Sequence, residues 1–313
     1  MLAYILRRLV VSIPTLWAVL TLVFLIVRVL PGDPAQAALG DYASKAAVEA
    51  LQKKMGLDAP LVVQYGRFLG GLLQGDLGKS LITGKSVAEQ IIFVLPYTLQ
   101  LTFASILLGI LLGVPLGILT AVGRNSVLDY LGRIFSLAGL SVPAFYLGII
   151  LLLVFSVQLD WFPVVGAGDP ASVGSLLHHL VLPALTLGLI MTAYVTRMTR
   201  SAMLNILSED YVRTARAKGL ANQVVMFRHA LRSALIPIVS IVGLFAVSLI
   251  GSSVMTEIVF SRPGLGKLMF GAMKQRDYTM LQSIMVIYAF LIVIINLVVD
   301  ILYGFVDPRV RYD

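Results

Sequence analysis

The chain has 313 residues, of which 58% are hydrophobic and only 13% are charged, and its mean hydropathy is +0.93. Soluble domains average about 45–50% apolar and about 25% charged residues, so the composition excludes a pair of ordinary soluble domains. The absence of cysteine excludes disulfides, thiolate metal sites and cysteine nucleophiles. The net charge of +8 is better explained by basic cytoplasmic loops of a membrane protein than by nucleic-acid binding, because no aromatic-basic motif accompanies it.

Six apolar stretches recur along the chain, each close to the length of about 20 residues that a transmembrane helix needs. They cover residues 9–30, 97–122, 134–157, 180–198, 235–257 and 281–305. The sequence therefore predicts an all-α polytopic membrane protein with about six transmembrane helices.

The distribution of Lys and Arg predicts the orientation of these spans. With the N-terminus in the cytoplasm, thirteen basic residues fall on the cytoplasmic side. The short outer loops then hold four, namely Arg262, Lys267, Lys274 and Arg276. Both termini are therefore expected in the cytoplasm, in agreement with an even number of spans.

This topology divides the chain into four parts. Residues 1–30 hold the cytoplasmic N-terminus and the first span, and residues 31–96 form a long outer segment. Residues 97–305 form a five-helix core with a cytoplasmic loop at 197–234, and residues 306–313 form a cytoplasmic tail. In the outer segment, Val48, Leu51 and Met55 share one helical face. We expect short surface helices there, either as a docking surface for a partner or as a structural cap.

Small residues mark the second span. Gly109, Gly113 and Gly117 recur at intervals of four and lie on one helix face. Because small residues so spaced let two helix backbones approach closely, the favoured interpretation is helix packing rather than a role in the transport pathway.

The sequence offers no catalytic, cofactor-binding or metal-binding set. Gly78, Lys79 and Ser80 resemble the end of a phosphate-binding loop, but Leu73 stands where that motif needs its first glycine. His178 and His179 are adjacent and have no acidic ligand at a metal spacing nearby. No nucleophile elbow frames a serine. We expect neither ATP hydrolysis nor any other catalysis in this chain.

Polar residues inside predicted spans are the remaining candidates, because such residues are costly in a membrane. On the fifth span, Ser248, Ser252 and Glu257 belong to a small, mildly polar helix that either packs tightly or lines a pore. On the sixth, Asn296 and Asp300 lie one turn apart. We interpret Asp300 as a structural group paired with a nearby arginine or helix end, and take Ser248, Ser252, Glu257 and Asn296 as candidate pore-lining residues.

The cytoplasmic loop at 197–234 carries seven of the thirteen inner charges. Ser208, Glu209 and Asp210 are good helix-start residues, with acid at the positive end of the helix dipole. A short helix is predicted over 211–218, and Gly219 is a natural terminator. Such a charged helix suits a protein-docking element, although a loop that only sets the topology has the same composition.

The stretch YVRTARAKGL (211–220), followed by FRHALRSALIP (227–237), resembles the cytoplasmic loop of ABC importer permeases, in particular the dipeptide, oligopeptide and nickel permease family. The general form of that loop has Glu-Ala-Ala before a glycine, whereas Arg213, Thr214 and Ala215 stand there in this chain, a variant that resembles the peptide branch. Further stretches resemble the same branch: LAYILRRLV (2–10), LPGDPA (30–35), EIVFSRPGLGKL (257–268) and LYGFVDPRVR (302–311).

The resemblance implies a type I ABC importer permease fold in a bacterial or archaeal inner (plasma) membrane. It implies a second homologous permease subunit, two cytoplasmic ATPases that hold ATP and Mg²⁺, an extracytoplasmic substrate-binding protein, and surrounding membrane lipid. The loop residues that would meet an ATPase are Glu209, Tyr211, Arg213, Thr214, Ala215, Arg216, Lys218 and Gly219, with the small Ala215 against the partner. Di- or oligopeptides are the favoured substrates, nickel chelates and glutathione are the alternatives, and an ion-coupled secondary transporter is the competing class.

Overall fold

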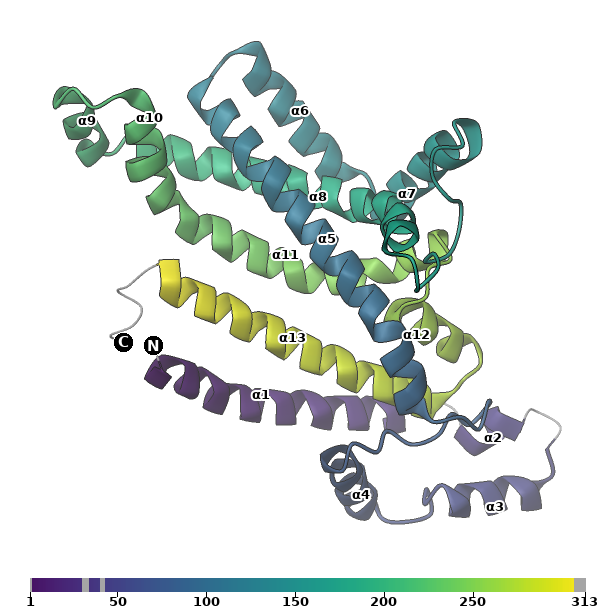
Figure 1. Ribbon diagram of the computed structural model, residues 1–313. Coiled ribbons are helices and arrows are strands. Elements are labelled where there is room, and N and C mark those ends of the chain that lie inside the picture. Colours follow the sequence, from purple (N-terminus) through teal and green to yellow (C-terminus); the bar gives the residue numbers. More distant parts are fainter. Residues whose placement is uncertain (1, 30–33, 40–42, 307–313) are drawn as a thin grey trace. The chain divides into compact units, whose positions relative to one another are not determined.

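The computed structural model describes residues 2–29, 34–39 and 43–306. Within these residues the regular elements are helices (Figure 1), apart from one isolated bridge between Lys79 and Ser86. Five of the helices are long and apolar enough to cross a membrane, and a bent pair makes a sixth if it is counted as one span. The predicted all-α class is confirmed. Most of the LPGDPA stretch, and residues 307–313 at the C-terminus, lie outside the described residues.

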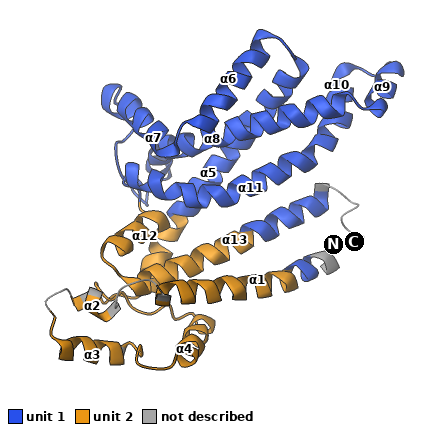
Figure 2. Ribbon diagram, turned by 180° about the vertical axis from the view of Figure 1, so that it is seen from behind, with its two compact units in different colours: residues 1–8, 97–262, 295–313 blue, residues 9–96, 263–294 orange. Residues whose placement is uncertain are grey.

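The chain forms two compact units (Figure 2). Unit 1 comprises Met1–Arg8, Tyr97–Arg262 and Ile295–Asp313, and unit 2 comprises Leu9–Pro96 and Pro263–Ile294. Three helices contribute residues to both units: α1 (Leu2–Val29), α5 (Val87–Val122) and α13 (Tyr278–Val306).

In unit 1, two long helices pack along each other, α8 (Val173–Leu207) and α11 (Leu231–Val259). The helix α6 (Val127–Ser141) packs on α8, while α7 (Ala144–Leu152) packs on α8 and on α11. Leu101, Leu187, Met191, Val195 and Leu249 form the buried centre of this unit.

The glycine face of α5 meets α8 directly. Met191, Val195 and Thr199 of α8 lie against Gly109, Gly113 and Gly117, one opposite each glycine. A Cβ atom on Gly113 would lie 2.7 Å from the Cβ of Val195, a separation that packed side chains do not adopt. The packing interpretation of this glycine series is therefore confirmed.

The predicted span over residues 134–157 is a bent pair of helices in the structure. The structure has α6, then α7 continued by a π-helical segment (Leu153–Gln158), and the two parts are bent by 104°. The break falls at Val142, which is extended (φ −89°, ψ 124°) and precedes Pro143. The proline ring disfavours helical geometry in the preceding residue, and this ends α6.

An ion cluster that the sequence analysis did not single out joins α6 to α8. The Asp129 side chain has no exposed surface, and its Oδ1 and Oδ2 accept hydrogen bonds from Arg200 Nε at 2.5 Å and Nη2 at 3.0 Å. Arg133, one turn along α6, lies 3.3 Å from the same carboxylate. The backbone N–H of Asn125 also donates to Asp129. Two cations and an N–H group thus compensate the buried charge.

Unit 2 contains the short helices expected of the outer segment: α2 (Pro34–Leu39), α3 (Lys45–Lys54) and α4 (Leu61–Leu73). The helix α4 packs on α1 through aromatic contacts, with the Tyr65 and Phe68 rings 5.2 Å and 5.5 Å from that of Phe24. The Tyr65 hydroxyl also lies 2.6 Å from Thr21 Oγ1. These contacts hold the outer segment on the first span.

The start of α5 is tied to α13 and to α12 (Leu265–Lys274) within the same unit. Val87, Ile91, Leu265, Met280 and Ile284 form a buried cluster there. Beside it, the Ser80 hydroxyl donates to Asp277 at 2.5 Å, and the same carboxylate accepts the N–H of Met280 at the start of α13.

Asp300 pairs with Arg8 in unit 1, with 3.2 Å between Oδ2 and Nη1. The structural interpretation of Asp300, an ion pair with a nearby arginine, is confirmed. The pair links the first helix of the chain to the last.

Removing the buried carboxylate of the Asp129 cluster should destabilise unit 1. In Asp129→Asn, Arg200 loses its anionic partner, and we expect a loss of about 2 kcal/mol of unfolding free energy, typical of a hydrogen bond to a charged group. Thermal unfolding of the purified protein in detergent measures it. The matched control is Asp210→Asn, because the Asp210 side chain is 96% exposed; equal melting temperatures for the two variants would contradict the role of Asp129.

A double-mutant cycle tests the Arg8–Asp300 pair. Asp300→Ala and Arg8→Gln should each lower the melting temperature and the membrane yield, and the double variant should lose less than the sum, because the two singles remove one shared interaction. Strictly additive losses would contradict the pair. So would an Asp300→Ala protein of normal stability that differs only in substrate selectivity.

Candidate functional site

The loop between α8 and α11 holds the helix α9 (Asp210–Ala217). Its N-cap residue Glu209 is extended (φ −69°, ψ 147°), and Asp210 places a carboxylate in the first turn. Gly219 ends the turn with φ +75°, a conformation that L-residues rarely adopt. The predicted helix and its terminator are confirmed, with α9 beginning and ending one residue earlier than expected.

One face of α9 is buried within the chain. Val212 has no exposed surface and Ala215 is 7% exposed. Both pack against Val225, with Ile206 and Leu207 of α8 alongside. The small Ala215 was expected to lie against a partner; in the structure its methyl group is buried in the contact between α9 and its own loop.

The opposite face of α9 is exposed. Its exposed residues are Asp210, Tyr211, Arg213, Thr214, Arg216 and Ala217, and Lys218, directly after the helix, is exposed as well. Arg213 lies 3.4 Å from Asp210, and both side chains are largely exposed. Exposed pairs of this kind contribute little to stability, so these charges remain accessible to another surface.

The loop is fastened to the long helices of unit 1. The Tyr211 hydroxyl donates to Ser233 Oγ on α11 at 3.1 Å. After α9, a short turn α10 (Asn222–Val224) leads into a π-helical segment (Val225–Ala230) that continues as α11. Ala230 and Ala234 are buried in one cluster with Met203 of α8 and Ile118 of α5. A displacement of α9 would therefore be passed to three long helices rather than absorbed by a flexible linker.

Two of the four candidate pore-lining residues border a cavity of about 290 Å³ within unit 1. Ser248 and Ser252 on α11 line it together with Tyr194 of α8 and Phe245 of α11. The ring centroids of Tyr194 and Phe245 are 3.7 Å apart. The wall contains no charged side chain. Tyr194 and Phe245 were not predicted, because in the sequence they lie within apolar runs like any core aromatic residue.

Glu257 and Asn296 lie elsewhere. Glu257 has no exposed surface, and its Oε1 accepts hydrogen bonds from Thr98 Oγ1 at 2.7 Å and from Ser253 Oγ at 3.4 Å. Asn296 is exposed on α13 and does not line the cavity of Ser248 and Ser252. The four candidates thus occupy three different environments.

Arg262 is fully buried near Glu257. Its Nη2 donates to Gln100 Oε1 at 3.2 Å, and its guanidinium lies 5.5 Å from the centre of the Tyr97 ring. Burial lowers the pKa of Arg262 from its ordinary value, while the Glu257 carboxylate acts in the opposite sense. Sequence reasoning counted Arg262 only as an outer-loop charge.

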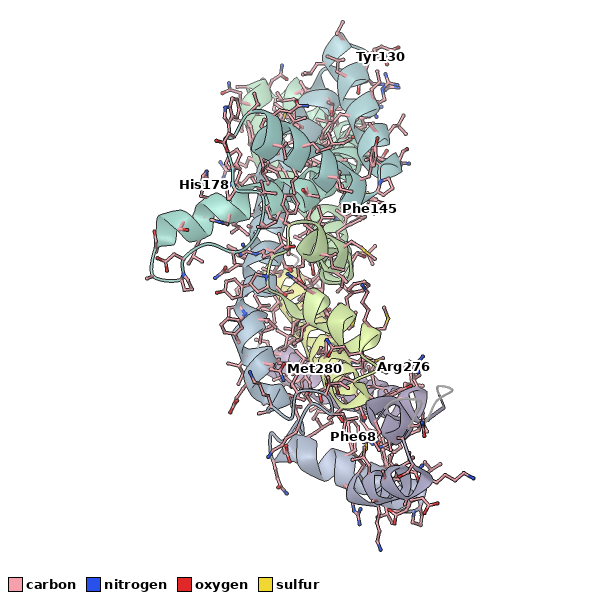
Figure 3. All side chains as sticks on the ribbon, turned by 90° about the vertical axis from the view of Figure 1, so that its right-hand side faces the viewer. Phe68, Tyr130, Phe145, His178, Arg276 and Met280 are labelled. Atoms are coloured by element: carbon pink, nitrogen blue, oxygen red, sulfur yellow. The ribbon has the colours of Figure 1, made fainter. Side chains whose placement is uncertain are left out.

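The adjacent histidines bind backbone carbonyl groups. His178 Nε2 lies 2.9 Å from the Trp161 oxygen, and His179 Nδ1 lies 2.9 Å from the Ser175 oxygen. Figure 3 labels His178, which lies near the start of α8. The His178 contact fixes the loop before α8, the His179 contact lies within the first turns of α8, and both rings have a structural role.

Comparison with known proteins agrees with this architecture. The fold is similar to that of the inward-facing MetNI methionine ABC transporter, with a TM-score of 0.56 and 21% identity over 70% of this chain and 96% of that one. The glutathione transport system permease protein GsiC of Pectobacterium atrosepticum is 43% identical over the full length of both chains. The di/tripeptide transport system permease protein DppB of Pseudomonas aeruginosa is 42% identical, covering 100% of this chain and 99% of the relative.

Two family descriptions match along the chain. Residues 1–102 match the N-terminal part of the binding-protein-dependent transport system membrane component. Residues 113–312 match the binding-protein-dependent transport system inner membrane component. The chain therefore belongs to this family, the multi-pass permease subunits of ABC importers.

Proposed function

We propose that this chain is the permease subunit of an importer for short peptides, and that the exposed face of α9 receives a cytoplasmic ATPase subunit. The observation that carries the proposal is the division of α9 into two faces. Val212 and Ala215 bury one face within the chain, while Tyr211, Arg213 and Ala217 lie on the exposed one. A helix held rigidly on one side and charged on the other is suited to a helix-in-groove contact.

Short peptides are the substrate class that the relatives favour. The names of the compared relatives specify glutathione and di/tripeptides, and glutathione is itself a tripeptide. The cavity beside Ser248 and Ser252 offers hydroxyl groups and two aromatic rings but no charge. Weak, uncharged contacts suit a pathway that must release its cargo, because tight binding would hold the substrate in the membrane.

The assembly that we propose contains a second homologous permease, two ATPase subunits with ATP and Mg²⁺, and an extracytoplasmic binding protein. Both termini and α9 face the cytoplasm, as the distribution of Lys and Arg indicates. ATP-driven closure of the ATPases would move α9 as a rigid body and, through Ser233 and Ala234, the inner end of α11.

The competing class, an ion-coupled transporter, relies on ionisable groups near the middle of the membrane that bind the coupling ion. In this chain Asp129 pairs with Arg200 and Asp300 pairs with Arg8. Because each of these acids is paired with an arginine of the chain, neither is placed to bind a coupling ion. This favours the ATP-driven proposal. Uptake that continues without a partner ATPase and stops when the ion gradient is collapsed would favour the competitor.

The proposed topology is directly testable because the chain has no cysteine. Lys218→Cys places a thiol on the exposed residue directly after α9, and Lys45→Cys places one on the exposed start of α3. A membrane-impermeant maleimide applied to intact cells should label only Lys45→Cys, whereas both should react after the membrane is opened. Labelling of Lys218→Cys in intact cells would contradict the orientation.

The docking proposal is tested with Ala217→Asp in the assembled importer. Ala217 is exposed on α9, so the substitution leaves the buried face intact but places a carboxylate in the expected contact. Disruption of a well-buried interface position costs about 2 kcal/mol or more, which corresponds to more than tenfold weaker coupling. The measurement is ATPase activity stimulated by substrate-loaded binding protein, together with co-purification of the ATPase.

Two matched variants complete that experiment. Ala46→Asp makes the same change at an exposed position of α3, outside the loop, and should leave co-purification of the ATPase unchanged. Ala215→Asp changes the buried face of α9 and should destabilise the loop itself, detected as faster proteolysis between α8 and α11. Normal insertion with undiminished stimulation in Ala217→Asp would show that α9 does not form the ATPase contact.

A further inference from the structure

Unit 2 contains a cavity of about 520 Å³ that the transport mechanism does not use. Its walls come from the end of α1, from α4, from the segment that precedes α5, and from the start of α13. Val27, Phe68, Leu72 and Leu77 form its apolar part; Phe68 on α4 is labelled in Figure 3. This volume lies within the range of about 300–1,000 Å³ that is usual for small-molecule sites.

Three cations line the cavity: Arg28, Arg67 and Lys79. Among the described residues, none of the three forms an ion pair with a carboxylate. Arg28 Nε is buried without a hydrogen-bond partner. The one acid in the wall is Asp76, whose Oδ1 accepts the N–H of Gly78 at 2.8 Å. The cavity therefore has a positive excess and an unused donor, which suits an oxyanion.

The space for one of these cations is provided by Gly56. This residue has φ +67°, and a Cβ atom there would lie 2.7 Å from Arg67 Nη1. A side chain at position 56 would be strained and would displace the guanidinium group. The turn before α4 thus leaves room for Arg67 at the cavity wall.

Gln64 adds an unused acceptor to the same wall. It is 8% exposed, and its Nε2 donates to the backbone oxygens of Leu57 at 3.1 Å and Ala59 at 2.8 Å. These bonds determine the orientation of the amide and leave Oε1 buried without a partner. Since an unsatisfied buried acceptor costs about 1–3 kcal/mol, a ligand that carries a hydroxyl or ammonium donor beside its anionic group would complement the site.

The cavity lies where two candidate membrane spans end, at the expected boundary between membrane and water. Arg28 is the last residue of one candidate span, Ile5–Arg28, and Tyr278 is the first residue of another, Tyr278–Phe305. Both residues line the cavity. The neighbouring helix α4 exposes apolar side chains, with Val62 81% and Leu73 90% exposed. Apolar surface beside arginines at the end of a span is typical of the headgroup region.

We propose that this cavity binds the phosphate headgroup of an anionic phospholipid. Arg28, Arg67 and Lys79 bind the phosphate oxygens, a headgroup hydroxyl donates to Gln64 Oε1, and the acyl chains lie along Val27 and the exposed face of α4. Guanidinium groups match the geometry of phosphate, which favours them over point charges at such a site. The site is independent of the proposed peptide transport, and its occupancy would hold α4 on α1.

The test is native mass spectrometry of the full chain released from vesicles of phosphatidylglycerol or phosphatidylcholine. The wild-type protein should retain phosphatidylglycerol in preference to phosphatidylcholine. Arg28→Gln and Arg67→Gln should each bind phosphatidylglycerol about tenfold more weakly, as expected for the loss of one charge-assisted contact. Lys45→Gln, an exposed cation on α3 outside the cavity, is the matched control and should bind like the wild type.

Inorganic phosphate and a dipeptide serve as competing probes. Displacement of the lipid by millimolar phosphate, lost in Arg67→Gln, would support the phosphate site and identify free phosphate as a second source of the anion. Equal retention of both lipids, or equal loss in Lys45→Gln and Arg67→Gln, would overturn the proposal. Displacement by the dipeptide but not by phosphate would instead indicate a substrate site. If Arg28→Gln fails to insert, the exposed positions Arg67 and Lys79 still provide the comparison.

Discussion

A backbone or side-chain polar group that enters hydrocarbon without a partner costs several kcal/mol, and this constraint determines how the molecule is built. It explains why the regular elements of the described chain are helices, since a helix satisfies its own backbone. It also explains the partners of three acids in the packed helices. Asp129 binds Arg200, Asp300 binds Arg8, and Glu257 accepts hydrogen bonds from Thr98 and Ser253. In each case an acid on one helix binds a group on another, so the same contacts that satisfy the carboxylates also fix helix positions.

The apolar environment also determines how the helices pack against one another. Because lipid tails are as apolar as leucine, helices associate through close van der Waals contact rather than through burial of apolar surface. Gly109, Gly113 and Gly117 bring α5 against α8 closely enough that a Cβ atom at any of them would overlap its neighbour. The cluster of Ala230 and Ala234 repeats this pattern at the base of the loop. Small residues thus make the connection between the loop and the long helices stiff.

The features that could be predicted from the sequence are those with a local cause. Apolar length predicts spans, glycine spacing predicts a packing face, and the run from Glu209 to Gly219 predicts α9 and its end. The bend at Pro143 was missed because the apolar run continues through it, although the proline itself was a usable signal. The pairing of Asp129 with Arg200 was missed because it joins positions 71 residues apart in the sequence. The four pore candidates were chosen for polarity alone, and polarity does not tell whether a side chain faces a cavity, as Ser248 does, or a hydrogen-bonded interior, as Glu257 does.

Ala215 shows how the loop reconciles stability with recognition. A short helix that docks on a partner must keep its shape while unbound, yet isolated helices of this length are unstable in water. The chain supplies the missing stability by burying Val212 and Ala215 beneath the helix and by joining Tyr211 to Ser233. Apart from Tyr211, the exposed side chains of α9 do not pack within the loop and can be shaped by a partner. It follows that the residues that define this element within the chain and those that would contact an ATPase overlap only at Tyr211 and are otherwise interleaved at helical spacing. A sequence match to the loop as a whole does not separate them, whereas the burial of each side chain does.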